Sequence, residues 1–139
     1  MEVRELKELM SGSDEDCLWV TLGFASELES CDVLHIVCDK KTDDQDRSYG
    51  MEGIYLERSD QSLGGYRGAD KIEIKESEVL LELNDEGQKQ LGFNGAVLFF
   101  YGKETEGAEG ALRVFSEMPK YECGGVIKMI DQPWEKAQN

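Results

Sequence analysis

Alternation of apolar and polar residues in the middle of the chain constrains the fold more than any other feature. In residues 53–58, Ile54 and Leu56 point to one side of an extended chain, whereas Tyr55 and Glu57 point to the other. Residues 71–75 repeat this pattern. Such strands are half-exposed and antiparallel, so they leave one polar face of a sheet free. Because the pattern carries no catalytic signature, a binding surface is the first hypothesis.

Further segments extend the expected sheet. Residues 18–24 alternate with four apolar side chains on one face, and residues 33–38 are their expected neighbour. Residues 79–83 follow residues 71–75 through a three-residue connection that suits a hairpin. Residues 96–101 are apolar on both faces, which predicts a central strand covered above and below. Residues 126–130 indicate a last strand. Residues 3–10 have apolar side chains at helical spacing, but this segment is short and a strand stays open.

Two helices are expected to accompany the sheet. Asn84 is a good N-cap for a short helix over residues 85–91, and Gly92 ends it. Residues 108–118 carry an apolar stripe that Pro119 ends, so this helix is predicted to cover the second face of the strand 96–101. The predicted class is therefore α+β: one domain over residues 1–139, a mostly antiparallel sheet, and one or two helices packed on one face.

The glycine-rich segment around residue 65 has two interpretations. It lacks the spacing of a phosphate-binding loop, so Gly64 or Gly65 supplies the positive φ of a turn between two strands. In the functional alternative, Tyr66 projects from this turn as an aromatic anchor for a partner.

The charge of the chain restricts its partners. Fifteen Lys and Arg against 30 Asp and Glu give a net charge of −15, spread along the whole sequence. Such a charge favours encounter with a basic partner and disfavours nucleic acid and anionic lipid surfaces. The sequence shows no apolar leader and no long apolar span, so we expect a cytoplasmic protein.

A search for catalytic and metal-binding patterns yields no assembled site. His35 is the single histidine, and on a strand it faces away from Cys38. The run Asp43, Asp44 and Asp46 lacks the glycine and glutamate that a calcium loop needs. The four scattered cysteines are expected to be reduced. We therefore predict no catalytic residue, no metal and no cofactor.

A resemblance adds to this interpretation. It is carried by the strand 53–58 with Ser59, Asp60, Gln61 and Ser62, by Gly65, Tyr66 and Gly68, and by the strands 71–74 and 79–83. This succession resembles the tenth-numbered family of immunity proteins from bacterial polymorphic toxin systems, in which an acidic-Gln motif precedes a Gly-Tyr-Gly-like turn. The Leu22–Phe24 segment is similar to an earlier Gly-Phe element of that family. Here Arg67 separates Tyr66 from Gly68, which departs from the pattern.

The resemblance extends over residues 17–118 and implies an α+β fold and a non-enzymatic role, the binding and neutralisation of a cognate toxin. Charge and resemblance together predict a basic toxin bound through an acidic surface that includes residues 40–50 or 60–66. The expected contacts are Asp43, Asp44, Asp46, Asp60, Gln61 and Tyr66. Two alternatives stay open: a small carboxylate-dependent enzyme, and a structural or adaptor module that forms a homodimer.

Overall fold

The computed structural model describes residues 1–26, 31–48, 50, 52–59 and 63–130. These residues form one sheet of nine strands, with three α-helices and two short 3-10 helices. The strands are β1 (Glu2–Ser13), β2 (Cys17–Phe24), β3 (Asp32–Asp39), β4 (Tyr55–Arg58), β5 (Gly64–Tyr66), β6 (Ala69–Ile74), β7 (Glu78–Leu83), β8 (Val97–Phe100) and β9 (Ile127–Met129). The helices are α1 (Asp44–Ser48), α2 (Asp85–Leu91), α3 (Ala108–Glu117), η1 (Met118–Lys120) and η2 (Glu122–Gly124). The predicted α+β class is confirmed, although the sheet is larger and more mixed than expected.

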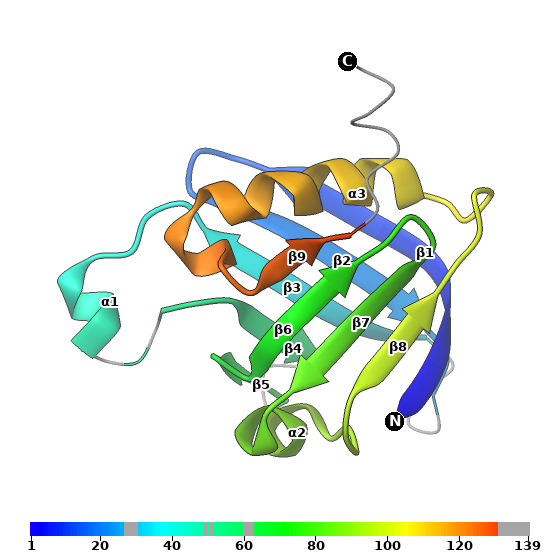
Figure 1. The fold of residues 1–139 in the computed structure, drawn as a ribbon, viewed down its shortest axis with the longest axis horizontal. Coiled ribbons are helices and arrows are strands. Elements are labelled where there is room, and N and C mark those ends of the chain that lie inside the picture. Colours follow the sequence, from blue (N-terminus) through cyan, green and yellow to red (C-terminus); the bar gives the residue numbers. More distant parts are fainter. Residues whose placement is uncertain (27–30, 49, 51, 60–62, 131–139) are drawn as a thin grey trace.

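Strand β1 joins the two halves of the sheet, whose order is β5-β4-β3-β2-β1-β8-β7-β6-β9. Its later residues pair antiparallel with β2, whereas its first residues pair parallel with β8. The β6–β9 pair is also parallel, and the remaining pairs are antiparallel. The β2–β1 register shifts between Leu6 and Glu8, and such a bulge bends a strand. The halves consequently curl over one another, with β6–β8 in front of β2–β4 (Figure 1).

The open question about residues 3–10 is thereby settled in favour of a strand. Leu6 and Leu9 are both buried although they are three residues apart, because the bulge between them shifts the alternation by one. Val3 and Met10 are 54% and 52% exposed. The apparent helical spacing is thus a strand alternation interrupted by a bulge.

The inward side chains of the two halves form the core, as the alternation predicted. Those of β2, β4, β6 and β7 are buried almost completely. Phe24 of β2 meets Phe99 of β8 with ring centroids 5.2 Å apart, and Phe93 lies 6.4 Å from each of them. These rings connect one half of the sheet to the other.

The prediction for α2 is confirmed at both ends. The Asn84 side chain accepts a hydrogen bond from the Gly87 N–H at 2.8 Å, and Gly92 adopts the left-handed conformation with φ of 69°. Gly87 also faces Gly68 so closely that a Cβ on it would lie 2.1 Å from the Gly68 carbonyl oxygen. Helix α2 therefore packs directly on the backbone that leads into β6.

The expected position of the second helix is wrong. Helix α3 has the predicted stripe, with Ala111 and Phe115 buried, but it packs against β1, β2 and β9 and not over β8. Strand β8 is consequently covered on one face: Phe99 is buried and Phe100 is 40% exposed. The outward side chains of β8 lie beside those of β1 and β7, which explains their apolar character without a covering helix.

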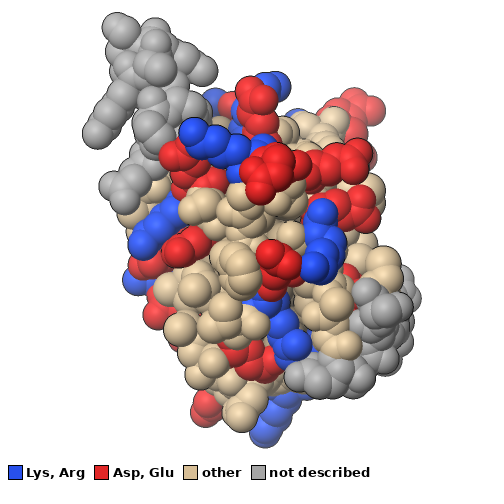
Figure 2. Space-filling model, turned by 90° about the vertical axis from the view of Figure 1, so that its right-hand side faces the viewer, with Lys and Arg blue, Asp and Glu red and all other residues tan. Residues whose placement is uncertain are grey.

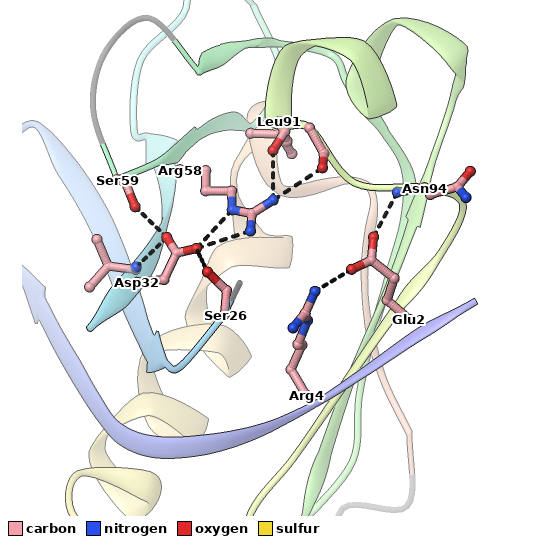
Figure 3. Close-up of polar contacts among 10 residues, drawn as sticks. Glu2, Arg4, Ser26, Asp32, Arg58, Ser59, Leu91 and Asn94 are labelled. Carbon is pink, nitrogen blue, oxygen red and sulfur yellow. Dashed lines mark hydrogen bonds and ion pairs between the residues drawn. The ribbon is translucent and has the colours of Figure 1, made fainter. Parts of the chain in front are cut away.

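A buried ion pair between Arg58 and Asp32 connects β3, β4 and the end of α2 (Figure 3). The Arg58 guanidinium donates to the Asp32 carboxylate at 3.1 and 3.0 Å, and to the carbonyls of Leu91 and Gly92 at 3.1 and 3.2 Å. Ser26 and Ser59 also donate to Asp32. Burial alone would raise the pKa of Asp32, but these hydrogen bonds and Arg58 lower it. The network ties β3, β4 and the end of α2 together.

The four cysteines are free, and Cys38 and Cys123 are buried. Burial raises the pKa of the Cys38 thiol to about 12, which keeps it protonated and unreactive. His35 points outward and Cys38 inward, as predicted. In the described part of the chain, no helix has the length and apolarity to cross a membrane.

Candidate functional site

The outer face of β2–β5 carries a continuous row of large side chains. The strand registers place Trp19 opposite Val37, Val37 opposite Tyr55, and Tyr55 opposite Tyr66, so one residue from each strand contributes. Residues opposite one another in a sheet lie on the same face in direct contact range. We call Trp19, Val37, Tyr55 and Tyr66 the aromatic row.

A second row beside it completes a shallow, open groove of about 270 Å³. Thr21, His35 and Glu57 are paired with one another across β2, β3 and β4. The Thr21 hydroxyl and His35 Nδ1 are 2.8 Å apart, which fixes the imidazole orientation. The groove is lined by Trp19, Thr21, His35, Val37, Tyr55 and Glu57.

The aromatic walls of the groove are held in place by their neighbours. Gly12 lies under Trp19: a Cβ at this position would be 2.4 Å from Cζ2 of the indole. Tyr55 packs on Tyr66 with ring centroids 5.0 Å apart. The Tyr55 hydroxyl donates to Glu57 Oε1 at 2.8 Å, and burial together with this contact raises its pKa to about 12. Tyr55 therefore stays protonated as a donor to Glu57 near neutral pH.

The outer face of β1–β5 is acidic. Its outward positions, as the strand registers pair them, carry Glu8, Asp39 and Glu57, and the exposed Lys7 precedes Glu8 at the bulge of β1, where it forms an ion pair with Glu5. Basic residues do occur on the molecule, and Figure 2 shows Lys and Arg interspersed with Asp and Glu on the side that it presents. The groove face thus combines aromatic rings with carboxylates.

The predicted acidic loop contains a short helix. Asp43 Oδ1 accepts from the Asp46 N–H at 2.7 Å at the start of α1, and Arg47 bridges Asp44 and Glu122 at 2.9 and 2.7 Å. These contacts attach α1 to η2. Asp43 and Asp44 are exposed, as a contact role requires, and Asp46 is half-buried.

Tyr66 lies in a strand and does not project from a turn. It is the last residue of β5, half-buried against Tyr55, and burial with nearby Asp39 and Asp46 raises its pKa. The structure therefore brings Tyr66 and Asp46 near one another. Asp60 and Gln61 lie outside the described residues.

The prediction of a positive φ at Gly64 or Gly65 is wrong, because that conformation occurs at Arg67, with φ of 57°. Gly65 instead gives space to Gln90, since a Cβ there would lie 2.5 Å from that side chain.

Comparison with known families decides the assignment. The sequence profile of the family described as Immunity protein 10 matches residues 6–106. The chain belongs to the Immunity protein 10 family. No curated protein and no solved structure matched in the same comparisons. Membership in an immunity family indicates toxin immunity as the role of this chain.

The groove of this immunity-family chain is not evident from its sequence. Tyr55 and Glu57 were assigned to a free face, but Trp19 was not recognised as an outward residue between Leu18 and Val20. The available signal was an aromatic residue at a polar-face position of an alternating strand. Only the strand registers show that Trp19 and Tyr55 share one row.

The described residues of this immunity-family chain contain no group of three or more His, Cys, Asp or Glu that could hold a metal. The groove has a single carboxylate, Glu57. Among the described carboxyl groups, a raised pKa is found at Asp39, caused by burial and by Asp46 and Asp16. Glycoside hydrolysis needs two carboxylates across a cleft. The lining residues of the groove form no such pair.

Proposed function

We propose that this chain neutralises a cognate bacterial toxin by binding it through the outer face of β1–β5, without turnover of its own. The supporting observation is the aromatic row flanked by Glu8, Asp39 and Glu57. Tyr and Trp anchors are typical of the centres of protein interfaces. Such a complex, formed in the cytoplasm, would inhibit the toxin by occluding it.

The proposed toxin surface is basic. A net charge of −15 and an acidic docking face raise the encounter rate with a positively charged protein, because long-range attraction guides the two surfaces together. Asp43, Asp44 and Asp46 on and beside α1 are exposed or half-buried, and they extend this negative field next to Tyr66. In this proposal they act mainly on association, while the aromatic row holds the complex together.

Salt should therefore slow formation of the complex. We expect the association rate constant with the toxin domain encoded beside this chain to fall at least about tenfold between about 0.01 and 1 M salt, as the Debye length falls from about 30 to about 3 Å. Stopped-flow mixing measures this rate, and the dissociation rate constant serves as the internal control because it should change far less. An association rate independent of salt would contradict binding through an acidic face.

A homodimeric adaptor is the second candidate, since the other half of the sheet exposes apolar side chains. Val3, Leu98 and Leu80 form one cross-strand row beside Phe100. However, Glu5 and Glu78 flank Phe100 in the register, so a symmetric contact on this patch would bring carboxylates together. The toxin-binding role is favoured for this reason.

A further inference from the structure

The groove between Trp19 and Tyr55 is an open space floored by a small side chain. Trp19 lies on β2 and Tyr55 on β4, with the smaller Val37 between them on β3. The Trp19 indole lies over Gly12 of β1, and the Tyr55 ring packs on Tyr66 of β5, so both rings lean away from Val37. The space over Val37 is therefore open to a planar group that contacts the aromatic lining.

The volume of the groove argues against a larger ligand. Sites for drug-sized molecules and cofactors occupy about 300 to 1,000 Å³ and enclose most of the ligand. This groove has about 270 Å³ and is open to solvent. Its size is that of a docking site for a protruding side chain of a partner protein.

The chemistry of the lining selects a cation. Glu57 is the single carboxylate among the lining residues, and Tyr55 donates to one of its oxygens. A carboxylate accepts about four hydrogen bonds, so Glu57 retains capacity for further donors. The indole and phenol rings present electron-rich faces that attract cations. A planar guanidinium satisfies both requirements, because it stacks on aromatic rings and forms paired hydrogen bonds to a carboxylate.

We propose that the groove lined by Trp19, Tyr55 and Glu57 receives an arginine side chain of the toxin, with the guanidinium packed against the aromatic lining and bonded to Glu57. This inference rests on the proposed function and specifies the partner's chemistry. Trp19 is fixed over Gly12, and Tyr55 is fixed by Tyr66 and Glu57, so the walls are organised before the partner arrives.

The test uses N-acetyl-arginine amide as probe and does not require the toxin. The indole N–H resonance of Trp19 is followed by NMR at millimolar probe concentrations in a chain whose other tryptophan is replaced, Trp134→Phe. We expect a saturable shift with the arginine probe, several-fold weaker binding of N-acetyl-lysine amide, and no saturable shift with N-acetyl-citrulline amide, which has a similar shape and no charge.

Glu57→Gln is the decisive variant, and Glu78→Gln is the matched control, because Glu78 is also a half-buried strand residue but lies on β7. Loss of a charge-assisted hydrogen bond should weaken binding of the arginine probe at least about tenfold in Glu57→Gln, with no change in Glu78→Gln. Amide dispersion verifies that each variant is folded. Equal shifts with arginine and citrulline, equal affinity for lysine, an unaffected Glu57→Gln chain, or no saturable shift would each overturn the assignment. Toxin binding itself is measured separately. The arginine site and the proposed toxin-binding function can therefore fail independently of one another.

Discussion

Replacing Arg58 by Ala should lower the free energy of unfolding by about 3 to 5 kcal/mol. The substitution leaves the carboxylate of Asp32 buried without its cationic partner and also removes the donors to the Leu91 and Gly92 carbonyls. The guanidinium lies 4.1 Å from the Phe93 ring centroid, so packing is lost as well. Urea unfolding followed by circular dichroism measures the change. Against a typical total stability of about 5 to 15 kcal/mol, this is the largest single effect that we expect.

Arg47→Ala is the matched control, since Arg47 also joins two carboxylates but lies at the surface. Its removal should leave stability nearly unchanged, because exposed ion pairs contribute little. A similar loss in the two variants would show that Arg58 does not hold a buried network.

The effect of Arg58→Ala should also depend on pH. The folded pKa of Asp32 lies below its ordinary value of 3.8, so its stabilising contribution is present above about pH 4 and is lost as the pH falls through the folded pKa. Protonated Asp32 no longer needs a cationic partner. The stability difference between wild type and Arg58→Ala should therefore shrink in acid, and a constant difference would contradict this account.

Truncation of Tyr66 should weaken toxin binding by about 2 kcal/mol or more, about thirtyfold, if the aromatic row is the centre of the interface. Its ring packs on Tyr55, which lines the groove. Tyr66→Ala therefore removes contact area and also leaves Tyr55 without the ring that holds it in place. Dissociation should accelerate more than association slows. Calorimetry of Tyr66→Ala with the cognate toxin domain gives the affinity, and kinetic mixing gives the two rates.

Tyr66→Phe separates the ring from its hydroxyl and should retain most of the affinity. The exposed Asp43→Asn should cost much less than Tyr66→Ala, because Asp43 lies beside α1 and contributes mainly through its charge. Unchanged affinity of Tyr66→Ala would reject the aromatic row as the binding site while leaving the immunity role intact.

Much of the sheet could be predicted from local pattern, because strands buried on one face show it directly. Ile54 and Leu56, and the Asn84 and Gly92 caps of α2, follow from period-two alternation and from cap chemistry. Strand β1 could not be assigned, since its bulge imitates helical spacing. The apolar outward residues of β8 were misinterpreted because sequence does not tell a helix-covered face from a half-exposed apolar one.

The candidate site depends on long-range pairing and was only partly accessible. The sequence indicated Tyr66 and the acidic residues Asp43, Asp44 and Asp46 as candidate contacts, because of their residue types and the residues that flank them. Their relation to Trp19, Tyr55 and Glu57 is created by the registers of four strands, and no local pattern encodes those registers. The resemblance around residues 53–83 indicated the immunity-protein family, which the family match over residues 6–106 confirms.

The most direct test of the central claim is a titration of the cognate toxin. Toxin activity is measured while the purified protein is added in increasing molar ratio. A stoichiometric inhibitor that acts by occlusion predicts a linear fall in activity that ends near one equivalent, with active toxin recovered when the complex dissociates. Full toxin activity in the presence of excess chain would contradict the immunity role, and permanent inactivation by a small fraction of an equivalent would show turnover in place of binding.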